Sequence, residues 1–398
     1  MKKTKKNLKT DNTLINNETN EDIMKVLKHY LKQMKSTYKD DNMSCKIYKR
    51  LIHSYKESLK INHELIFEDM NMDSLSLRTT TFISPKIIKY IQNHMIYKYT
   101  IYFNYKNVDF KINICTENSC DVNKYIMYIK WIICLCLINL QNETREVMNV
   151  DFYMTHLKKQ VDVPFQYSIQ PIHVNSGFTQ LNNEMYICIF RKEEWMKVFI
   201  HECFHAFNMD FHEEQIHFKN IFKSTFFVES DFLVFESFVE FWARIINCAI
   251  FTIQINPSMP SSAFCELFSL NLNIERIHSI LQATKLLNLF NLCYEDIINK
   301  EKESTCRALY KENTNAFCYY IITSILMNDF DRTIQWFDLN NNDLFQFDKS
   351  ERQVIIFCYY IKQIANESNF VSLMNELKTH DNNLNPFMKM TLFEININ

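Results

Sequence analysis

The stretch that decides the fold is WMKVFIHECFH, residues 195–205, in which His201 and His205 stand four residues apart and Glu202 follows the first histidine. Apolar residues recur around it at helical spacing, which predicts an α-helix over residues 191–209. Side chains at positions i and i+4 of a helix lie on one face, about 6 Å apart, so both imidazoles can bind one metal ion. Glu202 can then reach a water on that metal, and this HExxH pattern therefore predicts a zinc site with a general base.

The apolar surroundings of the motif strengthen this interpretation. Burial of two histidines and a glutamate without partners would cost several kcal/mol, and a bound metal removes that cost. The alternative is a pair of core histidines satisfied by hydrogen bonds, with Glu202 on the surface. The apolar neighbours are Val198, Phe199, Ile200, Phe204 and Phe207.

A catalytic zinc site needs a third protein ligand and one open position. In metzincins the third histidine comes six residues after the second, with a glycine between them; here those positions are Phe211 and Asn208. His212 misses the spacing by one residue. We therefore expect His212 to lie in the cleft or on the surface and not to bind the metal.

A second candidate source of the third ligand is the apolar helix predicted after residue 230. Glu236 and Glu240 stand four residues apart on it, and two carboxylates on one face of so apolar a helix repel each other and are costly to bury. We assign Glu236 as the third ligand and Glu240 as an acceptor that orients a ligand histidine. The reverse assignment, Glu229 as the ligand, and an ordinary exposed acidic stripe remain alternatives.

With HExxH followed by a glutamate on a second helix, the chain resembles the gluzincin class of zinc metallopeptidases, including the thermolysin-like and M1 aminopeptidase families. In those families a short edge strand that binds substrate backbone precedes the HExxH helix. The segment that matches it is Asn175, Ser176, Gly177 and Phe178, and the single glycine of the chain lies there. A close backbone approach or a plain bulge would equally explain Gly177.

The resemblance, which covers about residues 172–245, implies a zincin fold with one Zn²⁺ per chain, bound by His201, His205 and Glu236. It implies that Glu202 takes a proton from water and delivers it to the leaving amine. The M1 residue that grips a free amine has no counterpart between residues 175 and 179, so the resemblance favours an endopeptidase. A second electrophile normally stabilises the oxyanion, and the candidates are Tyr319, Tyr320 and His212.

Upstream of this motif, the spacing of apolar residues changes from the helical period to strict alternation. Alternation over Tyr99–Tyr105 and Val108–Ile114 predicts a β-hairpin with its turn at Lys106 and Asn107. The other expected elements are a helix over residues 21–62, a helix over 123–140, strands over 147–155, 173–179 and 185–190, and helices from residue 191 onward.

We therefore expect an α+β fold in three parts. Residues 1–22 form a basic disordered tail, and residues 23–209 form an N-terminal subdomain in which a mixed sheet covers the HExxH helix. Residues 210–398 form a mainly helical C-terminal subdomain that carries the third metal ligand.

Composition excludes several other functions. The 398 residues include one glycine, where average usage gives about 28, so no glycine-rich phosphate loop or nucleophile elbow can form. Turns must then use Asn and Asp, a bias typical of an AT-rich genome such as that of a protist or a large DNA virus. A net charge of −2 argues against nucleic acid as a partner. We expect a monomer that acts on a peptide or protein.

The cysteines and apolar runs bear on location. The 13 cysteines are scattered without a CxxC pair, which is typical of thiols in a reducing compartment. No apolar region follows the basic N-terminus, so a secretory signal is not expected. The run over residues 125–140 carries Lys130 and favours a buried helix over a membrane span. These features predict an intracellular protein, or a virion protein if it is viral.

Two rival functions remain. In the first, the protein is a non-catalytic, zincin-like interaction protein with a structural zinc or none. In the second, it is a zinc hydrolase of non-peptide amides, which would use the same ligands as the peptidase. Glu202 stands where a catalytic zinc site needs a general base, and a structural zinc site needs no base. Its presence therefore favours an enzyme.

Overall fold

The structure of the protein is a computed structural model that describes residues 41–70, 82–139, 146–165, 167–181, 184–211, 216–378 and 386–395. The predicted tail, residues 1–22, lies outside the described residues. So does the first half of the helix expected over residues 21–62, whose second half is α2 (Asp41–Ser58).

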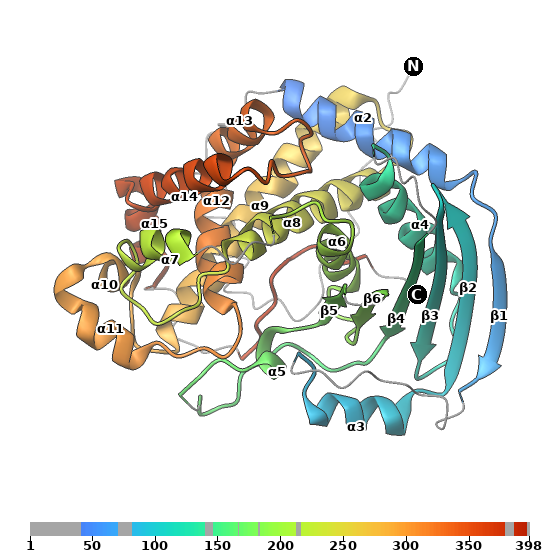
Figure 1. Cartoon of the computed structure of the whole chain (residues 1–398), viewed down its shortest axis with the longest axis horizontal. Helices are drawn as coiled ribbons and strands as arrows, with labels where there is room; N and C mark the ends of the chain where they lie inside the picture. The colour runs from blue at the N-terminus through green and yellow to red at the C-terminus, as the bar shows by residue number, and fades with distance from the viewer. Residues whose placement is uncertain are drawn as a thin grey trace, which may run out of the picture.

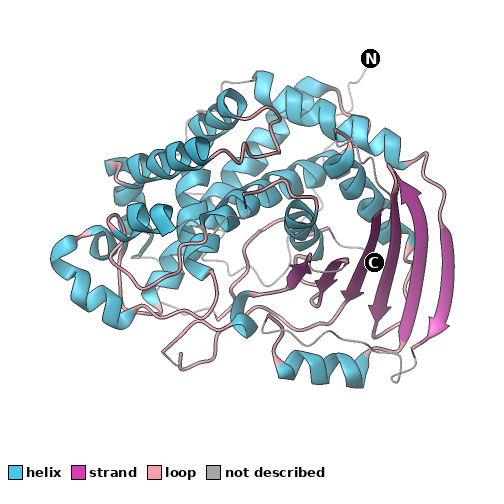
Figure 2. Cartoon of the chain, viewed as in Figure 1, coloured by secondary structure: helices cyan, strands magenta, loops and turns pink. Residues whose placement is uncertain are grey.

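The described chain is α+β, with one mixed six-stranded sheet in the order β1-β2-β3-β4-β6-β5 (Figure 2). β3, β4 and β6 run parallel to one another, whereas the pairs β1–β2, β2–β3 and β5–β6 are antiparallel. β5 is therefore an edge strand. The strands are β1 (Glu64–Asp69), β2 (Tyr97–Tyr105), β3 (Val108–Thr116), β4 (Glu146–Tyr153), β5 (Gly177–Gln180) and β6 (Met185–Ile189).

Helices make up most of the remaining described chain. Those of the first half, after α2, are α3 (Pro85–His94), α4 (Asn123–Leu137), α5 (Pro171–Val174) and α6 (Trp195–Ala206). Those of the second half are α7 (Ile216–Lys223), α8 (Val234–Ile255), α9 (Ser261–Asn288), α10 (Tyr294–Ile298), η3 (Lys300–Lys302), α11 (Glu303–Leu309), η4 (Phe317–Ile322), α12 (Thr323–Asn328), α13 (Phe330–Asn340), α14 (Glu351–Ala365) and α15 (Ser368–Lys378).

The helices form layers around the sheet (Figure 1). α4 and α6 pack together, and α6 lies against β5 and β6, while α3 belongs to a smaller apolar cluster with Phe178 and Tyr186. α8 packs on α6, and α9 packs on α8. The HExxH helix is thus held between the sheet and the helical half of the protein.

The predicted hairpin is confirmed as β2 and β3, with Tyr105 paired to Val108. Lys106 and Asn107 both have positive φ, 50° and 62°. Positive φ at both central residues is the type I′ turn that matches the twist of a hairpin, for which glycine is normally used. This glycine-poor chain uses Asn and Lys instead.

Other expectations are confirmed or corrected in the same way. The helix over 123–140 and the strand over 147–155 are present as α4 and β4. The strand expected over 173–179 is wrong at its start, because Pro171 begins the short helix α5, and β5 begins only at Gly177. β1 and α3 were not expected from the sequence.

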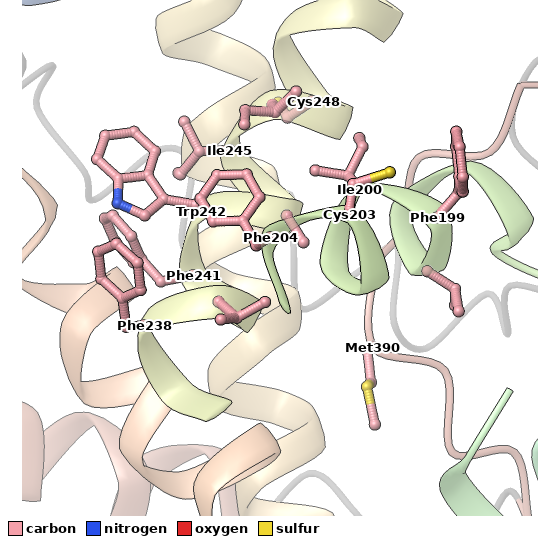
Figure 3. Close-up of a cluster of buried hydrophobic side chains, with 14 of the residues drawn as sticks. Phe199, Ile200, Cys203, Phe204, Phe238, Phe241, Trp242, Ile245, Cys248 and Met390 are labelled. Carbon is pink, nitrogen blue, oxygen red and sulfur yellow. The ribbon is translucent and has the colours of Figure 1, made fainter. Parts of the chain in front are cut away.

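One apolar core runs through both predicted subdomains, from Met43 on α2 to Ile395 near the C-terminus. Figure 3 shows its centre, where Phe204 of α6 faces Phe238 and Trp242 of α8. α2 also packs against α9, so the first described helix of the predicted N-terminal subdomain contacts the predicted C-terminal subdomain.

α8 is the one described helix that is long and apolar enough to cross a bilayer, and 89% of its most apolar window is buried inside the protein. The run at 125–140, expected to be a buried helix, is α4, whose residues from Trp131 to Leu137 are buried.

Residues 386–395, which we call the C-terminal strap, form an extended segment that crosses the protein after α15. Its backbone pairs with Lys159 and Val161 of the N-terminal half. Side chains of the helical half bind it as well: the hydroxyl of Tyr320 donates to the Met388 carbonyl at 2.6 Å, and the Asn247 amide to that of Phe393 at 2.8 Å. The strap therefore joins the two halves.

Candidate metal centre

α6 and α8 present their polar residues to each other. The buried side chains of His201 and His205 lie on the face of α6 that meets α8, and Glu236 lies opposite on α8. One nitrogen from each histidine and one oxygen of Glu236 all lie within 4.8 Å of one another, so this group could hold a metal ion.

The three donor atoms are closely matched in distance. His201 Nε2 and His205 Nε2 are 3.1 Å apart, and Glu236 Oε2 lies 3.2 Å from the first and 3.3 Å from the second. Ligands about 2.0–2.1 Å from a tetrahedral zinc stand about 3.3 Å from each other. The separations fit zinc without movement of the side chains.

The outer nitrogens of both imidazoles determine which tautomer each has. His201 Nδ1 donates to Glu240 Oε2 at 3.2 Å, and His205 Nδ1 donates to Asp210 Oδ2 at 2.6 Å, because a carboxylate can only accept. When the imidazoles are neutral, both Nε2 atoms therefore carry the lone pair and lie beside Glu236 Oε2. In that state the three acceptors repel one another unless a metal ion or a proton lies between them, so the donor set can hold a metal.

The ionisation of the same groups reflects their mutual contacts. Burial lowers the pKa of each histidine, but Glu236 and Glu240 outweigh burial for His201, and Asp210 and Glu236 do so for His205, whose pKa is well above its usual value. Burial raises the pKa of Glu236, yet His205 and His201 hold it below the ordinary range. Each carboxylate therefore favours a protonated imidazole, and each imidazole favours an ionised carboxylate.

Glu240 has a supporting position and not a central one. Lys197 Nζ donates to both of its oxygens at 3.0 and 2.9 Å, and Arg244 Nε donates to Oε1 at 2.8 Å. Although burial raises the pKa of Glu240, these two cations hold it well below its usual value. The structure places Glu236, and not Glu240, among the three donor atoms, while Glu229 is exposed and pairs with Arg307.

The end of α6 explains how Asp210 reaches His205. Asn208 has φ 52°, and the amides of Asn208 and Met209 donate to the carbonyls of His205 and Phe204. This is the Schellman motif, which ends a helix with a left-handed residue, usually glycine. The tight reversal brings Asp210 back under the imidazole of His205.

Asn315 holds the second oxygen of the candidate ligand. Its Nδ2 donates to Glu236 Oε1 at 3.1 Å, which leaves Oε2 directed at the two histidines. Asn315 comes just before η4, 79 residues after Glu236 in the chain. Sequence reasoning gave Asn315 no role.

Glu202 points toward β5. Thr179 Oγ1 donates to Glu202 Oε2 at 2.7 Å, so a residue of the edge strand orients the candidate base. A Cβ at Gly177 would stand 2.8 Å from Val198 Cγ1 and 3.1 Å from Glu202 Oε1. Of the two explanations for Gly177, the close approach of strand and helix is the one that the geometry supports.

The predicted substrate-binding segment divides between two faces. Asn175, Ser176 and Gly177 line a cavity together with His201 and Glu202. Phe178 does not: its buried side chain packs with Phe82 and Tyr186 in the smaller apolar cluster. Alternate residues of a strand point to opposite faces, which places Phe178 away from the site.

The two tyrosine candidates also separate. Tyr319 lines the same cavity, and its ring centroid is 5.8 Å from that of His201. Tyr320 points away, because its hydroxyl binds the Met388 carbonyl of the strap, so its expected catalytic role is not supported. Both lie in η4, a π-helical turn, and such turns are frequent at functional sites. His212 lies outside the described residues.

Burial, followed by the charges of Glu236 and Glu202, raises the pKa of Tyr319 well above its usual value, although Asn315 opposes the shift. The hydroxyl therefore keeps its proton near neutral pH and can donate a hydrogen bond.

Sequence reasoning missed Asp210, Asn315, Thr179, Lys197 and Arg244. A periodic signal existed for two of these, since Lys197 precedes His201 by four residues and Arg244 follows Glu240 by four. Extending each helix face by one turn beyond His201 and Glu240 would have identified Lys197 and Arg244.

Comparison of the chain with protein-family models, with curated proteins and with solved structures finds no match. The function must therefore be argued from the site itself.

Proposed function

We propose that this protein is a zinc-dependent peptidase, with His201, His205 and Glu236 as metal ligands and Glu202 as general base. The convergence of three acceptor atoms beside a carboxylate that is not part of the cluster supports the proposal. The fold we infer is of the zincin type, in which an edge strand and the HExxH helix border the cleft.

A zinc ion bound here would lower the pKa of water and polarise the scissile carbonyl. Glu202, held by Thr179, accepts a proton from the attacking water and passes it to the leaving amine. Tyr319 donates a hydrogen bond to the carbonyl oxygen as negative charge develops on it. Among the described residues, β5 pairs only with β6, so its outer edge offers a place where an extended peptide can add as a further strand.

A cavity beside the cluster favours catalysis over a structural zinc. A structural site is closed by four protein ligands, whereas here the described residues supply three, and the cavity borders both His201 and Glu202. The rival, non-catalytic function predicts that Glu202 can be replaced without consequence.

The experiment measures zinc per chain by elemental mass spectrometry, and cleavage of a peptide library by mass spectrometry. The variants are His205→Ala, Glu236→Ala and Glu202→Gln, with Glu229→Ala as the matched control. We expect about one zinc per chain in the wild type, in Glu202→Gln and in the control, and marked loss in the two ligand variants. Cleavage by Glu202→Gln should fall by about 10²–10⁴-fold.

Two results would refute the proposal. Wild-type protein that takes up no zinc after metal reloading has no such site. Protein that binds zinc but cleaves no peptide, or that cleaves equally well as Glu202→Gln, is not a peptidase of this mechanism.

A further inference from the structure

Two cysteines meet where α2 packs against the start of α9. Cys45 lies near the beginning of α2, and Cys265 lies in the second turn of α9, 220 residues further along the chain. Their sulfur atoms are 3.6 Å apart, and both residues are thiols. Sulfur atoms in van der Waals contact reach bonding distance, about 2.05 Å, by small rotations of the two side chains. The pair can therefore form a disulfide bond.

Neighbouring contacts hold the two helices together at this point. Tyr48, one turn after Cys45 on α2, donates its hydroxyl to the Met259 carbonyl at 2.8 Å. The centroid of its ring is 4.8 Å from that of Phe264, the residue before Cys265. These contacts fix α2 against the start of α9, so the two sulfur atoms can bond without a rearrangement of either helix.

Cys45 is the member of the pair that solvent reaches. It is half-buried, whereas Cys265 is only 4% exposed. The hydroxyl oxygen of Ser261, the first residue of α9, lies 3.2 Å from Cys45 Sγ, and the first turn of α9 contains no acidic residue. A helix N-terminus and a hydroxyl donor both stabilise negative charge on sulfur. A small oxidant should therefore react first with Cys45.

The other cysteines are less suited to this reaction. Apart from Cys45, only Cys120 and Cys293 are half-buried, and the rest are buried. Burial raises the pKa of Cys120. Burial also raises the pKa of Cys293, and so does its hydrogen bond to Asp296, to which the thiol donates at 2.9 Å. A raised pKa lowers the fraction of thiolate, which is the form that attacks an oxidant.

We propose that Cys45 and Cys265 are a redox-active pair, in which a peroxide oxidises Cys45 and Cys265 then joins it in a disulfide that links α2 to α9. Disulfides in reducing compartments are usually transient and redox-sensing. The pair lies apart from the candidate metal centre, since neither thiol belongs to the donor cluster or lines its cavity. The modification is therefore independent of the proposed peptidase function.

The reaction has two steps. The Cys45 sulfur attacks one oxygen of hydrogen peroxide, the O–O bond breaks, and the products are a sulfenic acid on Cys45 and one water. The Cys265 sulfur then attacks the Cys45 sulfur, the S–S bond forms as the S–O bond breaks, and the leaving hydroxide takes the thiol proton to become a second water. Two thiols lose two electrons and two protons, and one peroxide is reduced to two waters.

The test treats the reduced full-length protein with stoichiometric hydrogen peroxide, blocks the remaining thiols and maps disulfide-linked peptides by mass spectrometry. A parallel sample contains dimedone, which labels sulfenic acids. The variants are Cys45→Ser and Cys265→Ser. Cys293→Ser is the matched control, because it removes another half-buried thiol. The wild-type map gives the main result even if a variant fails to fold.

We expect the wild type and Cys293→Ser to lose two thiols and to form one disulfide, between residues 45 and 265, which dithiothreitol reverses. Cys265→Ser should accumulate dimedone-labelled sulfenic acid on Cys45, whereas Cys45→Ser should form no disulfide at Cys265. The disulfide closes a long loop and so restricts the unfolded chain. Oxidation should therefore raise the melting temperature of the wild type, by about 5 °C, and leave that of Cys45→Ser unchanged.

Three results would overturn the proposal. The first is a wild-type protein that keeps all its thiols under peroxide. The second is oxidation that falls mainly on other cysteines. The third is a sulfenic acid on Cys45 that persists in the wild type, since Cys265 would then not react with it. None of these results bears on zinc binding or on peptide cleavage, so the peptidase proposal stands or falls separately.

Discussion

A carboxylate ligand is useful only if one chosen oxygen faces the metal, and at this site a neighbouring amide makes that choice. Asn315 donates to Glu236 Oε1, so the remaining oxygen points at the two imidazoles. The histidines are oriented in the same manner by Glu240 and Asp210. Residues that touch ligands in this way typically change metal affinity by 10–100-fold when they are replaced.

We therefore expect Asn315→Ala to weaken zinc binding by about 10–100-fold, because Glu236 would then be free to rotate. Zinc affinity is measured by competition with a chelator, and the melting temperature of the zinc-free protein is measured in parallel. Asn313→Ala is the control, since the Asn313 amide binds Gln170 and not Glu236. An unchanged affinity in Asn315→Ala would refute the positioning role.

At the scale of elements, the ends of α6 decide where its motif points. Glu194, just before the helix, has φ 56°, and Asn208, two residues after its last residue Ala206, has φ 52°. Both positions would suit glycine, and this chain fills them with other residues. The second reversal returns Asp210 to His205, so the candidate metal cluster depends on how the helix ends.

Two substitutions of Asn208, just after α6, should differ in their effect on the free energy of unfolding. Asn208→Gly keeps the left-handed backbone, and Asn208→Ala strains it by about 1–2 kcal/mol. Both variants lose the contact of the Asn208 side chain with Lys349, so the difference between them reports the backbone alone. We expect Asn208→Ala to be less stable than Asn208→Gly by about 1 kcal/mol in urea unfolding. Equal stability would show that the Schellman motif does not constrain α6.

At the scale of the whole protein, the C-terminal strap connects the helical half to the residues that support the site. Glu194 Oε1 accepts from the Thr391 amide at 2.5 Å, and Glu275 Oε2 accepts from the Leu392 amide at 3.0 Å. Burial raises the pKa of Glu275 to about 7, although Arg244 and the strap amide oppose it. The strap is thus held by a carboxyl group that titrates near neutral pH.

This raised pKa makes stability depend on pH. An unfolded glutamate has a pKa of about 4.3, so between pH 4.3 and 7 the folded state binds more protons than the unfolded state. The stabilisation that this proton provides is complete below about pH 4 and is lost as the pH rises through 7. Relative to Glu275→Gln, the wild type should lose about 3 kcal/mol of unfolding free energy between pH 5 and 8.

The measurement is urea unfolding of both zinc-free proteins across that pH range. Glu266→Gln, an exposed change on the same helix α9, is the control and should track the wild type. Parallel curves for the wild type and Glu275→Gln would contradict the prediction.

Much of the site was predictable because its signals are local. The four-residue spacing of His201 and His205, and that of Glu236 and Glu240, follows from the helical period, and alternation predicted the β2–β3 hairpin. These patterns depend on residues within one or two turns of each other. The sequence by itself therefore determined the α+β class, the candidate metal ligands and the helices that carry them.

Only the tertiary structure decided which residues surround those ligands. The pairing of Asn315 with Glu236, the choice of Tyr319 over Tyr320, and the proximity of Cys45 to Cys265 depend on contacts between segments far apart in the chain. Such contacts follow from how the helices, η4 and the strap pack, and no spacing along the chain encodes them. Periodicity selects the face that a side chain occupies, but packing selects its partner.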